Sequence, residues 1–115
     1  MYQFSYAEVL EDDQADARRV EYRALDRAVE SLTRAAAFQS PSREGVEALH
    51  FTIELWTTFM RELAAPENAL PAELRANLIS IGIWVLKEAD AIRLGRSTNY
   101  QGIAEICGIV RDGLR

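Results

Sequence analysis

The segment spanning residues 66–95 constrains the fold more than any other part of the sequence. It reads PENALPAELRANLISIGIWVLKEADAIRLG and has hardly any polar side in its middle. Pro71 suits the first helical position and Gly95 suits the left-handed residue after the last turn, so we predict a helix between them. Its apolar residues form two neighbouring stripes, Leu74, Leu78, Ile81, Val85 and Ile92 in one and Ile79, Ile83 and Leu86 in the other. A helix this apolar must be buried on more than one side, either as the central element of a bundle or as one wall of a partner groove.

Two further helices are predicted before this segment. The first spans residues 13–38, where an apolar face and small alanines recur at helical spacing. Ser40 suits the N-cap and Pro41 the first residue of the second helix. This helix ends before Pro66, because the residue preceding a proline is pushed out of the α region. It carries a complete apolar stripe, formed by Val46, Leu49, Ile53, Trp56, Met60 and Leu63.

A fourth helix is predicted after residue 97. Thr98 and Gln101 have the spacing of a capping box. The apolar stripe that follows consists of Ile103, Ile106, Val110 and Leu114. Strand-like alternation occurs only at Tyr2, Phe4 and Tyr6, which we interpret as a short extended arm laid on the helices. The sequence therefore predicts an all-α fold, a small four-helix bundle-like single domain over residues 1–115 with a short N-terminal arm and mostly antiparallel helices.

Composition narrows the class of protein. Hydrophobic residues make up 49% of the 115 residues, which argues against disorder. The net charge of -5 argues against direct nucleic-acid binding, although a local basic patch on the arginine-rich first helix stays open; we interpret those arginines as a solvated face. No apolar run approaches the roughly 18 residues that span a bilayer, and the first residues lack the features of a secretory signal. We therefore expect a cytoplasmic protein without membrane insertion.

Few residues offer chemistry. Cys107 is the only cysteine and lies in an apolar run, which favours a buried thiol over a reactive one. His50 is the only histidine and shares a helical face with Glu47 and Glu54. This group could in principle act as a general base, but an ordinary surface ion pair is the better interpretation, since no nucleophile or oxyanion donors accompany it. We expect no catalytic residues, no metal site and no cofactor.

Trp84 is the strongest candidate for a binding residue. By the helical period it projects with Asn77 and Ser80 from the least apolar side of its helix. A large aromatic side chain among polar residues is typical of interface anchors. We therefore predict a partner-binding surface at Asn77, Ser80 and Trp84. Burial of Trp84 against the first helix or the N-terminal arm is the alternative.

Several motifs together resemble the bacterial flagellar regulator family FlaF. They are Ser42-Arg43-Glu44, Leu55-Trp56, Pro66-Glu67-Asn68, Leu70-Pro71 and the run NLISIG at residues 77–82. The similarity covers essentially the whole chain, as a single FlaF-like helical domain. It implies a non-enzymatic cytosolic factor that binds flagellin, acts as a secretion chaperone and regulates flagellin synthesis, with the regulator FlbT as a candidate second partner. The alternative is a post-transcriptional regulator that binds flagellin mRNA directly or through FlbT.

Overall fold

All four helices expected from the sequence are present. The computed structural model describes the backbone of residues 6–38 and 42–114, and the side chains of residues 15–38 and 42–114. Helix α1 spans Tyr6–Ala36, α2 spans Arg43–Ala64, α3 spans Ala72–Arg93 and α4 spans Tyr100–Asp112. The described residues contain no strand. The prediction of an all-α, four-helix fold is therefore confirmed.

The start of α1 corrects one expectation. The helix begins at Tyr6 rather than near residue 13, so Tyr6 is helical and does not belong to an extended arm. No glycine or proline occurs between Tyr6 and Ala36, and nothing in this stretch therefore breaks the helix. The other two residues assigned to the arm, Tyr2 and Phe4, lie outside the described residues.

The caps of α2 and α4 also differ from the sequence prediction. Ser42, not Ser40, is the N-cap of α2, and its hydroxyl oxygen accepts a hydrogen bond of 3.0 Å from the Gly45 amide. Asn99, not Thr98, caps α4, with its side-chain oxygen 3.0 Å from the Gly102 amide nitrogen. Ser40 and Pro41 lie outside the described residues.

The ends of α3 follow the prediction closely. Pro71 is the N-cap rather than the first helical residue, so the helix begins one residue later than predicted, at Ala72. Gly95 has φ of 76°, the left-handed conformation that glycine adopts without steric cost. Its amide donates to the Ile92 carbonyl at 3.0 Å, and the Arg96 amide donates to the Ala91 carbonyl at 2.8 Å. This pair of bonds is a Schellman motif, which satisfies carbonyl groups at the end of the helix.

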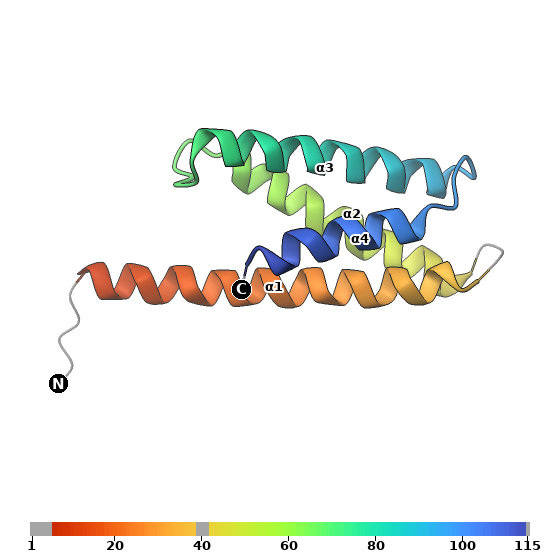
Figure 1. Ribbon diagram of the computed structural model, residues 1–115, viewed down its shortest axis with the longest axis horizontal. Coiled ribbons are helices and arrows are strands. Elements are labelled where there is room, and N and C mark those ends of the chain that lie inside the picture. The colour runs from red at the N-terminus through yellow and green to blue at the C-terminus, as the bar shows by residue number, and fades with distance from the viewer. Residues whose placement is uncertain (1–5, 39–41, 115) are drawn as a thin grey trace.

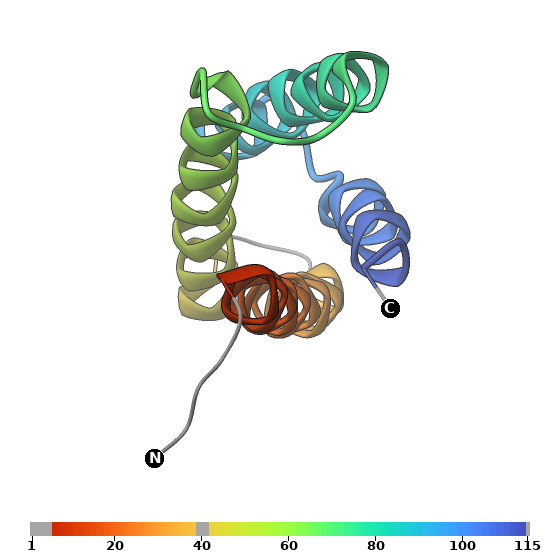
Figure 2. The ribbon, with the colours of Figure 1, turned by 90° about the vertical axis from the view of Figure 1, so that its left-hand side faces the viewer.

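The helices form a ring in chain order. Consecutive helices run in opposite directions (Figure 1), which confirms the antiparallel prediction. Among the described residues, α1 packs on α2 and α4, and α3 packs on the same two helices. Viewed along the bundle, α2 lies on one side and α4 on the other, between α1 and α3 (Figure 2). The molecule measures 57 × 30 × 18 Å, and α1 continues well past the end of α4 (Figure 1).

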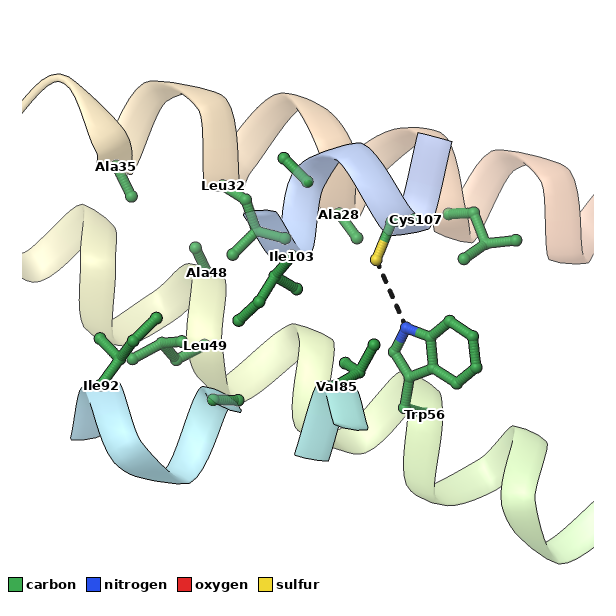
Figure 3. Close-up of a cluster of buried hydrophobic side chains, with 13 residues drawn as sticks. Ala28, Leu32, Ala35, Ala48, Leu49, Trp56, Val85, Ile92, Ile103 and Cys107 are labelled. Atoms are coloured by element: carbon green, nitrogen blue, oxygen red, sulfur yellow. Dashed lines mark hydrogen bonds between the residues drawn. The ribbon is translucent and has the colours of Figure 1, made fainter. Parts of the chain in front are cut away.

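Trp56 of α2 occupies the centre of the core, where it is only 1% exposed. Its Nε1–H donates to the Cys107 Sγ of α4 at 3.4 Å (Figure 3), so the buried indole N–H has a partner. Several core positions are alanines, which let the helices approach closely: Ala28, Ala35, Ala48, Ala89 and Ala104. At Gly82 of α3, an added Cβ would collide with the side chain of Met60. Small residues therefore set the spacing between α3 and α2.

Candidate partner-binding surface

Trp84 lies on the outer side of α3, where it remains 40% exposed. Ser80, one turn earlier, and Asn77, two turns earlier, are exposed beside it. The structure therefore brings the three predicted residues to one solvent-facing side of one helix. It does not bury Trp84 against α1, because the side chain is 40% exposed and the backbones of α1 and α3 do not approach each other within the described residues. A role in binding remains a prediction.

The exposed surface of α3 is more apolar than the sequence indicated. Leu74 and Ile83 are each 45% exposed, although both were assigned to buried stripes. Val85, Ala89 and Ile92 are buried, as expected for Val85 and Ile92. Leu74 lies on their side of the helix but near its start, whereas Ile83 lies on the opposite side. The reason is that α3 has only α2 and α4 as neighbours, and α4 packs much more extensively on α1 than on α3. The side of α3 that faces away from the ring is therefore left uncovered. The prediction of a central helix was therefore wrong, while its alternative, a wall open to a partner, fits the exposure.

Charged residues are absent from the middle of this surface. The nine residues 76–84, ANLISIGIW, contain none. Beyond them, Lys87 is exposed, Asp90 and Arg93 form an ion pair, and Glu88 accepts a hydrogen bond of 2.5 Å from the hydroxyl of Ser97. Interfaces tend to be depleted of charge in their centre and polar at their rim. The surface around Trp84, defined here as the outer face by Asn77, Ser80, Ile83 and Trp84, has that distribution.

The two candidate chemical residues have the environments predicted for them. His50 is on the surface, with its Nε2 3.0 Å from Glu54 Oε1, while Glu47 pairs with Arg43 at 2.9 Å instead. Cys107 is fully buried. Burial raises the pKa of its thiol, and the hydrogen bond from the Trp56 indole opposes this only in part. The surface position of His50 beside Glu54 and the buried position of Cys107 are both as predicted.

The arginines of α1 form a solvated face, as predicted: Arg18, Arg19, Arg23, Arg27 and Arg34 are all exposed. Some already have partners, since Arg19 pairs with Asp16 and the Arg27 guanidinium lies 4.3 Å above the Phe51 ring. Sequence reasoning missed the ion pair between Arg111 of α4 and Asp26 of α1, at 2.8 Å. The two residues are 85 positions apart, and no local pattern links them.

Neither a metal-binding cluster nor a membrane span occurs among the described residues. No group of three or more His, Cys, Asp or Glu side chains could hold a metal ion within residues 15–38 and 42–114. None of the helices, in the part of the chain that the structure describes, combines the length and the apolar character needed to cross a bilayer.

Fold and surface together define a small all-α protein with one helix partly uncovered on its apolar side. Comparison with known families gives this class a name. The family model described as flagellar protein FlaF matches residues 2–114. The chain therefore belongs to the FlaF family, and it is a flagellar protein. Neither the curated proteins nor the solved structures contain a match.

Proposed function

We propose that this protein is a non-enzymatic, cytoplasmic flagellar assembly factor that binds flagellin, acts as its secretion chaperone and regulates its synthesis. The observation that carries the proposal is the charge-free outer face of α3, with the half-exposed Trp84 at its centre, in a chain that belongs to a flagellar family. A cytoplasmic location follows from the proposed role, because a secretion chaperone meets its client before export.

The outer face suits the client chemically. Flagellin termini form long amphipathic helices that bury their apolar sides only in the assembled filament. Before export those sides need cover, and an amphipathic helix commonly binds by laying its apolar side against a partner's exposed apolar surface. Ile83 and Trp84 supply large apolar groups, while Asn77 and Ser80 add hydrogen-bonding groups beside them. Aromatic anchors of this kind contribute about 2 kcal/mol or more to binding.

The non-enzymatic part of the proposal rests on the two residues best suited to chemistry. The thiol of Cys107 is buried and its pKa is raised, so it is protonated at neutral pH and a poor nucleophile. The side chain of His50 is 73% exposed beside Glu54, so water surrounds most of the imidazole ring. Neither residue has the surroundings of a catalytic group.

Direct binding of flagellin mRNA is the second candidate. It is favoured by the five exposed arginines along α1. Against it stand the net charge of -5 and the contacts that already engage Arg19 and Arg27. A regulatory effect exerted through FlbT would need no RNA contact from this chain, and we therefore rank it above direct binding.

Titration of unpolymerised flagellin into the purified protein, followed by calorimetry, tests the proposal. Ile83→Asp places a charge on the outer face and should weaken binding at least about tenfold. Ile109→Asp is the matched control, because Ile109 is 67% exposed on α4, away from that face, and it should change affinity less than about twofold. Equal affinities of the two variants, or no flagellin binding by the wild type, would contradict the proposal.

The RNA alternative is tested with the same protein preparations. If α1 contacts phosphates, binding of the flagellin message should be tight and should fall steeply between about 50 and 200 mM salt. We expect weak binding or none. Tight, salt-sensitive binding that Arg23→Gln reduces would reverse the ranking of the two functions.

A further inference from the structure

Two charged residues of opposite sign flank the outer face of α3. Glu73 lies seven residues before Ser80, and Lys87 lies seven residues after it. Seven residues are almost two helical turns, so the three side chains project from the same side of α3, and each charge lies about 10.5 Å along the helix from Ser80. All three residues are exposed. The face therefore has a negative charge at one end, a positive charge at the other, and no charged residue between them on that side.

Both flanking charges are available to a partner molecule. Neither Glu73 nor Lys87 forms an ion pair with any residue that the structure describes. Asp90 lies one turn after Lys87, but it is paired with Arg93. A partner that matches this face must therefore carry a positive charge opposite Glu73 and a negative charge opposite Lys87.

The two halves of the face also differ in the size of their side chains. Trp84, four residues after Ser80, is the largest side chain of the face, whereas Ala76, four residues before Ser80, is small and exposed. Ile83 and Asn77 lie three residues after and three residues before the same serine. The bulky group of one half therefore corresponds to a small group in the other half.

A second copy of the same helix, turned end for end, matches this pattern. A two-fold axis through Ser80 brings each residue of one α3 against the residue that lies equally far on the other side of Ser80 in the second copy. Lys87 then lies against Glu73 of the second copy, and Trp84 lies over Ala76 of the second copy. Because the contact is isologous, each of these pairs occurs twice.

The outer face is accessible to a second molecule. Helix α3 lies along one edge of the molecule in both views (Figure 1, Figure 2). Val85 and Ala89, which are buried on α2 and α4, lie on the opposite side of the helix. Two copies can therefore meet through α3 without any change in the packing of the four helices.

We propose that two copies of this protein associate through the outer faces of α3, antiparallel to each other and related by a two-fold axis at Ser80. Ion pairs between Glu73 and Lys87 close both ends of the contact, and the indole of Trp84 packs over Ala76. The dimer is weak and reversible, because the contact is only one helix wide and each chain carries a net charge of -5. This association goes beyond the proposed function and does not depend on it.

Charge reversal tests the pairing without removing apolar surface. Sedimentation equilibrium of the wild type, from about 10 μM to about 1 mM protein in about 150 mM NaCl, should show monomers and dimers. Glu73→Lys and Lys87→Glu each place two like-charge pairs in the dimer and should weaken it at least about tenfold. In a mixture of the two variants, one copy brings two lysines and the other brings two glutamates. This mixture should therefore associate about as well as the wild type.

Glu105→Lys is the matched control. Glu105 is exposed on α4, away from α3, and has no ion pair in the part of the chain that the structure describes. Its reversal changes the net charge as much as Glu73→Lys does. Fluorescently labelled Lys87→Glu should therefore associate at least about threefold more tightly with Glu73→Lys than with Glu105→Lys. Equal association with both, or a wild type that stays monomeric at about 1 mM, would overturn the proposal.

A cysteine on the two-fold axis locates the centre of the contact. Helices whose axes lie about 8–10 Å apart bring facing Cα atoms within about 6 Å, which a disulfide can span. Ser80→Cys should therefore cross-link two copies when treated with diamide, whereas Thr57→Cys, exposed on α2, should not. Cys107 is buried and does not compete. Equal cross-linking of the two variants would refute the proposed contact.

The dimer and the proposed function can fail separately. The charge-reversal mixtures contain no flagellin, so their outcome decides the dimer alone. A wild type that forms the dimer but does not bind flagellin contradicts only the proposed function. A wild type that binds flagellin but stays monomeric at about 1 mM contradicts only the dimer.

Discussion

The two tryptophans should respond very differently to truncation. Trp56 is 1% exposed at the centre of the core and Trp84 is 40% exposed on α3. Replacing a buried tryptophan by alanine removes its transfer free energy and leaves a cavity, and such changes cost about 3–5 kcal/mol. Trp56→Ala also leaves Cys107 without the indole N–H that it accepts. For Trp84→Ala we expect about 1–2 kcal/mol, because much of the ring already contacts water and alanine has the higher helix propensity.

These free energies convert into melting temperatures. At about 2.1 cal/mol/K per residue, the entropy of unfolding for 115 residues is about 240 cal/mol/K, so 1 kcal/mol corresponds to about 4 °C. Trp56→Ala should therefore lower Tm by about 12–20 °C, and Trp84→Ala by about 4–8 °C. Circular dichroism at 222 nm during heating measures both variants. Flagellin titration, at a temperature where both variants are folded, then measures the binding affinity of each.

The combination of stability and binding decides the role of Trp84. We expect Trp84→Ala to weaken flagellin binding about thirtyfold or more while the protein stays folded. If Trp84→Ala melts as early as Trp56→Ala, the assignment of Trp84 to the surface is refuted and its side chain belongs to the core. If it melts and binds like wild type, Trp84 has no part in the proposed surface.

Three further predictions concern single residues. Gly95→Ala should destabilise the protein by about 1 kcal/mol, because φ of 76° strains any side chain, whereas Gly113→Ala, at φ of -69°, should be nearly neutral in the same thermal melts. Burial, and next the charge of Glu62, raise the pKa of Glu21 above its ordinary value of 4.5. The stability that this group contributes is therefore lost as the pH rises from 4.5 through the raised pKa. Glu21→Gln should therefore raise Tm at pH 7 and have little effect near pH 4; the opposite pH dependence would contradict this. Burial likewise raises the pKa of Cys107 above 9.0, so the free energy of unfolding should fall as pH rises beyond 9.0, and Cys107→Ala should flatten that slope in urea titrations at pH 8 and pH 10.

The existence of the helices could be predicted from the sequence because it depends on local signals. The break before Pro66 and the left-handed Gly95 each act within one turn of chain, and both were located correctly. Caps were harder. Ser40 and Ser42, like Thr98 and Asn99, satisfy the same local rule, and only the path of the chain between helices decides which residue faces the free amides.

The exposure of Leu74 and Ile83 could not be predicted, because it depends on how α4 is placed. The sequence shows which residues of a helix are apolar, but not that α4 would pack mainly on α1 and leave the outer face of α3 uncovered. Long-range contacts such as Trp56 with Cys107 are outside the reach of periodicity for the same reason. The position of Trp84 could be predicted, since an aromatic residue among Asn77 and Ser80 departs from the pattern of its own helix.

The close pairing of α1 with α4 has a consequence for protein synthesis. α1 packs most extensively on the helix that is made last of the four, and Arg111 joins Asp26 across this contact. At about 5–20 residues per second, a ribosome needs several seconds to pass from the end of α1 to the start of α4. During that interval Leu25 and Leu32, both fully buried in the finished fold, lack the helix on which α1 packs most extensively. The apolar side of α1 therefore stays partly uncovered until α4 has been made.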